Sequence, residues 1–98
     1  MISHEEAHTS AREFLEHTSY AKEFTLVMQP ELTQEYPVAW AVRFDSQEHL
    51  DTGELAKAPF TRVLIVPKDG GAPHFPPSHM PVAQYMEQLS SNQPPTGA

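Results

Sequence analysis

Two apolar runs separated by a turn-rich stretch constrain the fold of this chain more than any other feature. In residues 38–45 large apolar side chains alternate with small or polar ones, and residues 61–67 are almost continuously apolar. Alternation with a period of two is typical of a strand with one buried face, and a short unbroken apolar run is typical of a strand covered on both faces. The sequence therefore predicts strands at 37–45 and 61–67, with the central position in the sheet going to 61–67.

The alternation also predicts which face of the first strand is buried. We expect its large side chains to face the core (Val38, Trp40, Val42 and Phe44). The opposite face, with Ala39, Ala41 and Arg43, is small enough to lie against a helix or to be half exposed. The single Trp of the chain is thus expected in the core rather than on a binding surface.

Helical periodicity marks two further segments. Ser3 and Glu6 have the spacing of a capping box, and the apolar stripe that follows predicts a helix over 4–17 (Ala7, Ala11, Phe14 and Leu15). Pro81 suits the first turn of a second helix, because a missing amide hydrogen costs nothing there. The stripe of this second helix has the same spacing (Val82, Tyr85, Met86 and Leu89).

The remaining segments complete the expected architecture. A strand over 24–29 ends at Pro30, residues 46–60 are expected to be irregular, and a turn at 69–71 leads to a short returning edge strand at 72–75. The order of elements predicts an α+β fold, a small antiparallel sheet of three to five strands with an N-terminal and a C-terminal helix packed on it. Residues 1–89 would form a single domain, and 90–98, which lack an apolar anchor, a disordered tail.

Charge and composition exclude several classes of function. Six Lys and Arg against 13 Asp and Glu give a net charge of −7, which repels nucleic-acid backbones and suits a basic protein partner. No apolar run is long enough to span a membrane, and the acidic N-terminus is not a secretory signal. The absence of cysteine fits a cytoplasmic protein.

One motif points to catalysis. Residues 4–8, HEEAH, match the zinc-protease pattern in which two histidines bind zinc and a glutamate activates water, here His4, His8 and Glu5. A terminal helix in a short chain leaves little room for a substrate cleft, and its buried stripe leaves both histidines toward solvent or at its margin. The chain also has no Gly-x-Ser-x-Gly elbow and no cysteine nucleophile. We therefore predict no enzyme, no cofactor and no metal.

Four acids lie close together without an intervening Lys or Arg (Asp45, Glu48, Asp51 and Glu54). They form either a docking patch for a basic surface or a solvated loop.

The order of features resembles that of the YrhB-like, immunity protein 35 family over about residues 2–89. The resemblance is carried by the Trp40 strand, the LAKAP segment at 55–59, the apolar run 63–66, an Asp-Gly turn and a helix that opens near 78–81. Departures from the family pattern are Ala39 for Gly, Lys57 and Ala58 for Gly-Asn, and Pro67 where Asp is common. Only a few residues carry over, as architectural positions (Trp40, Pro59, Asp69 and Gly70).

The resemblance implies a non-catalytic protein that neutralises a bacterial toxin by covering its active site. The contacts it would use are the four acids of 45–54 together with Tyr36 and Phe60, which we expect to be exposed aromatics. A small chaperone-like or adaptor protein is the alternative, and a zinc-dependent hydrolase using His4, Glu5 and His8 is a remote one. A homodimer paired through strand edges also stays open.

Overall fold

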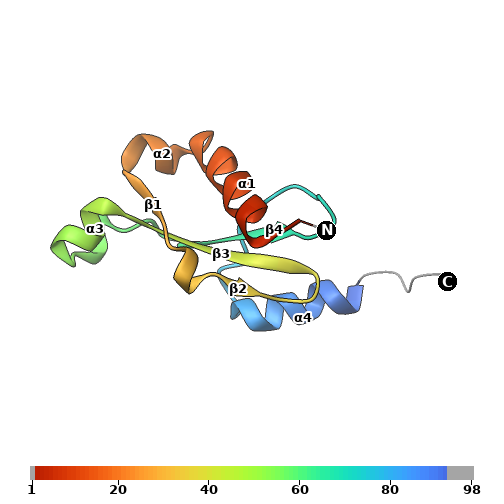
Figure 1. Ribbon diagram of the computed structural model, residues 1–98. Coiled ribbons are helices and arrows are strands. Elements are labelled where there is room, and N and C mark those ends of the chain that lie inside the picture. The colour runs from red at the N-terminus through yellow and green to blue at the C-terminus, as the bar shows by residue number, and fades with distance from the viewer. Residues whose placement is uncertain (1, 93–98) are drawn as a thin grey trace.

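The computed structural model describes residues 2–92, which form three layers. A four-stranded antiparallel sheet lies between helix α1 (His4–Glu16) on one face and helix α4 (Val82–Asn92) on the other (Figure 1). This confirms the predicted α+β class. Both predicted helices have the expected apolar stripes, so each covers one face of the sheet.

The strand that contains Trp40 is the centre of the sheet. Strand β3 (Ala39–Ser46) pairs with β1 (Leu26–Met28), β2 (Gln34–Glu35) and β4 (Val63–Pro67). The prediction that 61–67 is the central strand was therefore wrong. The outer edge of β4 has one isolated bridge, between Ile65 and His74, because the prolines around His74 have no amide hydrogen to extend a ladder. The expected returning strand at 72–75 is reduced to that bridge.

The larger core cluster lies between α1 and the sheet. It joins one stripe of the helix to alternate residues of β3 and β4 (Ala7, Ala11, Leu15, Trp40, Val42, Phe44, Leu64 and Val66). Trp40 is buried, as predicted, and its indole Nε1 donates a hydrogen bond to the Ile2 carbonyl at 3.2 Å.

A second cluster lies on the opposite face, against α4. The small residues of β3 and their neighbours form it (Ala39, Ala41, Ile65 and Met86). Of the two alternatives for this face, packing against a helix is the one found. Val38 packs against this second cluster and precedes the first residue of β3, so its predicted place beside Trp40 was wrong.

Helix α1 begins at the predicted capping box. The Ser3 hydroxyl accepts a hydrogen bond from the Glu6 amide at 3.2 Å, and Glu6 Oε1 accepts one from the Ser3 amide at 3.0 Å. Two amides at the open end of the helix are thereby satisfied.

Several short helices were not predicted. They are α2 (Ser19–Glu23), α3 (Gln47–Thr52) and the 3-10 turns η1 (Pro30–Leu32) and η2 (Leu55–Lys57). Helix α3 and the turn η2 lie within residues 46–60, so the expectation that this segment is irregular was wrong. Helix α4 continues to Asn92, three residues past the predicted domain boundary at 89. Residues 93–98 lie outside the described residues, so the disordered tail stays a prediction.

Candidate functional site

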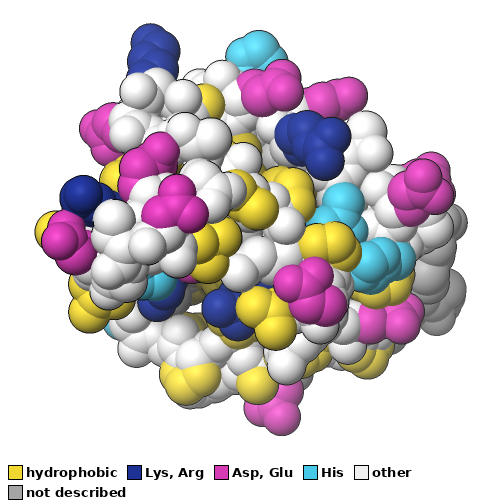
Figure 2. Space-filling model, turned by 60° about the vertical axis from the view of Figure 1, so that its left-hand side comes forward, with side chains coloured by type: hydrophobic (Ala, Val, Ile, Leu, Met, Phe, Trp, Pro, Cys, Tyr) yellow, Lys and Arg dark blue, Asp and Glu magenta, His cyan; other side chains and the backbone are white. Residues whose placement is uncertain are grey.

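The acidic stretch of the sequence lies at one end of the molecule. Helix α3 extends from the end of β3 and lies apart from the layered body (Figure 1). Figure 2 turns this end forward and shows acidic and hydrophobic side chains intermixed on it, above a hollow bordered by Lys or Arg side chains. We call residues 47–60, which contain α3 and η2, the projecting segment.

Two capping residues explain why α3 forms here. The Ser46 hydroxyl accepts a hydrogen bond from the His49 amide at 3.1 Å and donates one to the Lys57 carbonyl at 2.6 Å. Gly53 ends the helix with φ of 73°, a left-handed conformation that glycine adopts without strain. A serine N-cap followed by a glycine at the C-terminus was the signal by which the sequence could have revealed this helix.

Asp45 is not an exposed acid. Only 5% of its surface is accessible, and its carboxylate accepts hydrogen bonds from the Ser46 amide at 2.8 Å and from His49 Nδ1 at 2.9 Å. Arg62 Nη1 lies 3.9 Å from the same carboxylate. We call Asp45, His49 and Arg62 the Asp45 cluster. It joins the end of β3 to α3 and to the start of β4, so Asp45 is placed inside the fold rather than on a docking patch.

The Asp45–His49 pair has the arrangement by which a carboxylate orients a catalytic imidazole. A nucleophile is also required, and the neighbouring hydroxyl does not supply one. The Ser46 side chain is completely buried, and its hydroxyl is committed to the Lys57 carbonyl. The pair connects the end of β3 to α3.

Glu48 connects α3 back to the body of the protein. Its Oε1 accepts a hydrogen bond from the Thr25 amide at 2.9 Å. This backbone hydrogen bond stabilises the charged form and lowers the pKa of the Glu48 carboxyl below its usual value of 4.5. Glu48 thus has a structural contact in addition to its place beside the other acids.

The lowered pKa of Glu48 predicts a pH dependence of stability. Because the folded-state pKa is depressed, the carboxylate stabilises the fold at and above its unfolded value of 4.5, and this contribution is lost as pH falls through the folded pKa. Glu48→Gln lacks the titration, so between pH 7 and pH 3 wild type should lose more stability than the variant does. Urea midpoints measured across that range would test this; parallel curves would contradict it.

The other predicted contacts of the projecting segment are exposed. Asp51 and Glu54 face solvent, with Asp51 accepting a hydrogen bond from Gln47 and Glu54 paired with Lys57 at 3.5 Å. Phe60 is 84% exposed. Two further exposed apolar side chains, Leu50 and Leu55, were not singled out from the sequence.

Tyr36 lies elsewhere. It is half-buried against the α4-side cluster, and its hydroxyl donates a hydrogen bond to Gln34 at 2.9 Å. Tyr36 was expected to be exposed, and its partial burial corrects that expectation.

The histidines of the HEEAH motif are committed to hydrogen bonds within the fold. His8 is buried, contrary to expectation, and its Nδ1 lies 2.7 Å from the His4 carbonyl, an acceptor that requires Nδ1 to donate. Nε2 of the same ring lies 2.8 Å from the Thr33 hydroxyl oxygen. His4 Nε2 lies 3.3 Å from the Pro30 carbonyl. Within residues 2–92 no group of three or more potential metal ligands comes together.

The residues carried over from the family resemblance are two buried side chains and two residues of the turn after β4. Trp40 and Pro59 are buried. Asp69 Oδ1 accepts a hydrogen bond from the Gly71 amide at 2.9 Å, and Gly70 has φ of 88°, so the turn after β4 needs glycine there.

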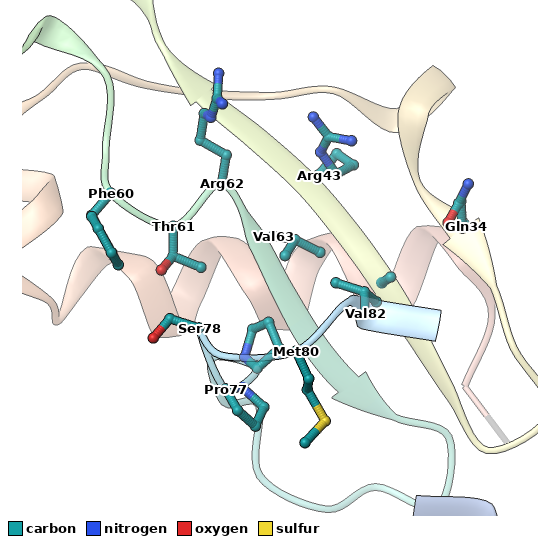
Figure 3. Close-up of a pocket in the computed structure, with 12 residues that line it drawn as sticks. Gln34, Arg43, Phe60, Thr61, Arg62, Val63, Pro77, Ser78, Met80 and Val82 are labelled. Atoms are coloured by element: carbon teal, nitrogen blue, oxygen red, sulfur yellow. The ribbon is translucent and has the colours of Figure 1, made fainter. Parts of the chain in front are cut away.

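A pocket of about 430 Å³ adjoins the projecting segment, and among the contact residues expected from the sequence only Phe60 lines it. It lies between the first residues of β4 and the loop that leads into α4 (Figure 3). Arg43 and Arg62 line one side and Met80 and Pro77 the other. No Asp or Glu is among its lining residues. Sequence patterns could not reveal it, because its residues come from segments far apart in the chain.

Fold and site together define a small α+β protein that has apolar and acidic side chains displayed on one projecting segment. The model of the immunity protein 35 family matches residues 5–88, and the chain belongs to that family. No curated protein and no solved structure gives a significant match. None of the described helices is long and apolar enough to cross a membrane.

Proposed function

We propose that this protein neutralises a bacterial toxin by binding the toxin domain and covering its active site or substrate groove. The observation that carries the proposal is the immunity protein 35 family match over residues 5–88. The protein would act in the cytoplasm of the cell that makes the toxin, without catalysis and without a cofactor. Its net charge of −7 favours a basic toxin surface over a nucleic acid.

The projecting segment is the proposed contact surface. Protein interfaces gain most of their affinity from a few apolar or aromatic anchors surrounded by polar groups. Leu50, Leu55 and Phe60 supply exposed apolar side chains within a short stretch, and Asp51 and Glu54 supply charge beside them. Glu48 is proposed as a contact at the edge of this surface, and Tyr36 as a contact outside it. Asp45 is proposed to hold α3 in place rather than to contact the partner.

Co-expression tests this function. The toxin encoded beside this gene should stop growth of a host cell, and production of this protein should restore growth. If the protein is instead an adaptor or chaperone, it should bind several partners and should not restore growth. If the protein failed to restore growth in the presence of that toxin, the proposed function would be contradicted.

Charge reversal on the projecting segment should weaken binding of a basic toxin. We expect Asp51→Lys with Glu54→Lys to slow association and to raise the dissociation constant about tenfold at low salt, since rim charges act mainly on the association rate. The matched control reverses two exposed acids elsewhere, Glu13→Lys with Glu31→Lys. Surface plasmon resonance at two salt concentrations would measure both variants. Equal effects of the two pairs would exclude the projecting segment as the contact.

A further inference from the structure

The pocket beside the projecting segment has a charge opposite to that of the chain. Two of its lining residues are arginines and none is acidic, although Asp and Glu outnumber Lys and Arg by 13 to 6 in the sequence. In Figure 3 the guanidinium groups of Arg43 and Arg62 lie on the same side of the pocket. Apolar side chains, among them Val63, Met80 and Val82, line the remainder.

Both arginines retain donors for a ligand. The Arg43 guanidinium has no carboxylate within 4.0 Å among residues 2–92. Arg62 reaches Asp45 only at 3.9 Å, and His49 binds that carboxylate more closely, at 2.9 Å. A guanidinium has five N–H donors in a planar fork, which matches the two oxygens of a carboxylate.

The outer edge of β4 at Val63 also lines the pocket, together with Pro76 and Pro77. Ile65 exchanges backbone hydrogen bonds with His74, and the Arg62 carbonyl accepts one from the Phe44 amide. Backbone groups alternate in direction along an antiparallel strand, so the amide and carbonyl of Val63 point away from β3, like those of Ile65. The chain beyond His74 continues into Pro76 and Pro77, which have no amide hydrogen with which to pair Val63.

We propose that this pocket binds an extended acidic segment of the partner protein. The segment pairs its backbone with Val63, its Asp or Glu carboxylate binds Arg43 and Arg62, and a neighbouring apolar side chain packs beside Met80. Addition of a strand to an open edge is a recurrent mode of peptide recognition. The inference rests on the proposed function, because it takes the ligand to be a segment of the toxin. A toxin that is basic overall can still carry one acidic segment. The apolar lining and the backbone of Val63 at the outer edge of β4 favour a peptide over a free phosphate ligand.

A random peptide library displayed on phage tests the proposal with the intact protein and without the toxin. Selected peptides should share an Asp or Glu beside a large apolar residue. Their affinity, measured by fluorescence polarisation, should fall about tenfold in Arg43→Met, which removes the fork and keeps an apolar side chain. Arg62→Met should weaken binding in the same direction. Arg12→Met, on the exposed face of α1, should bind the peptides like wild type.

Hydrogen exchange of the Val63 amide supplies a second measurement, and the bound peptide should slow it. Peptides without an acidic consensus, peptides that bind Arg43→Met as tightly as wild type, or an unprotected Val63 amide would each overturn the proposal. Its failure is distinct from failure of the proposed function. If peptide binding requires Arg43 but the protein does not rescue cells from the toxin, toxin neutralisation is contradicted and the peptide-binding pocket is supported. If the protein rescues cells but peptide binding does not depend on Arg43, toxin neutralisation is supported and the pocket proposal is contradicted.

Discussion

Replacing Phe44 by alanine should lower the free energy of unfolding by about 3–5 kcal/mol, the usual cost of removing a buried aromatic ring. Phe44 has no accessible surface. It lies on the central strand β3 and belongs to the larger core cluster, which also contains residues of α1. Domains of this size are stable by only about 5–15 kcal/mol in total. The variant should therefore be largely destabilised near physiological temperature.

Phe60→Ala is the matched control for this prediction. The substitution is chemically the same, but the Phe60 side chain is 84% exposed, so its removal should change stability by less than about 0.5 kcal/mol. Urea unfolding can be followed by the fluorescence of Trp40, the single Trp, which is buried in the core. Equal losses in the two variants would contradict the three-layer core described above. If Phe60 anchors a partner, its replacement should weaken binding while the fold is retained.

Asp45→Ala should cost about 2–4 kcal/mol of unfolding free energy, because it leaves buried donors without an acceptor. The substitution removes the carboxylate that receives the Ser46 amide and His49 Nδ1, and it releases Arg62. Helix α3 would lose its connection to the sheet at the same time. Local loss of α3 should appear as faster hydrogen exchange of its amides.

Asp51→Ala is the control for Asp45, since it removes an exposed acid from the same stretch of sequence. Its effect on stability should stay below about 1 kcal/mol, the range of surface substitutions. If Asp45→Ala were as stable as Asp51→Ala and still lost its partner, Asp45 would be a direct contact and the assignment of a supporting role would be wrong.

Local signals account for the elements that were correctly predicted. The capping box at Ser3 and Glu6 and the apolar stripe behind it depend only on residues within a few helical turns. The stripe that begins at Val82 is of the same kind. The alternation through Trp40 predicted a strand for the same reason, because side chains alternate between faces wherever a strand forms.

The errors concern relationships between segments. Residues 61–67 were predicted to be the central strand because they are apolar on both faces. Burial of both faces of a strand does not show whether both of its edges are paired with other strands. The structure gives the central position to β3. Four acids near one another in sequence left a docking patch and a solvated loop as alternatives, and both place Asp45 on the surface. The end of β3 instead turns Asp45 inward to meet His49 and Arg62.

The sequence by itself determined the two helices and the two principal strands of this protein, together with its acidic charge, because periodicity, caps and composition are properties of neighbouring residues. Only the tertiary structure decided which acid is buried, which histidines are committed to hydrogen bonds, and that Arg43 and Arg62 meet at one pocket. Those outcomes depend on contacts between residues far apart in the chain. Burial and charge at such contacts are set by what the fold brings together, and no local pattern records that.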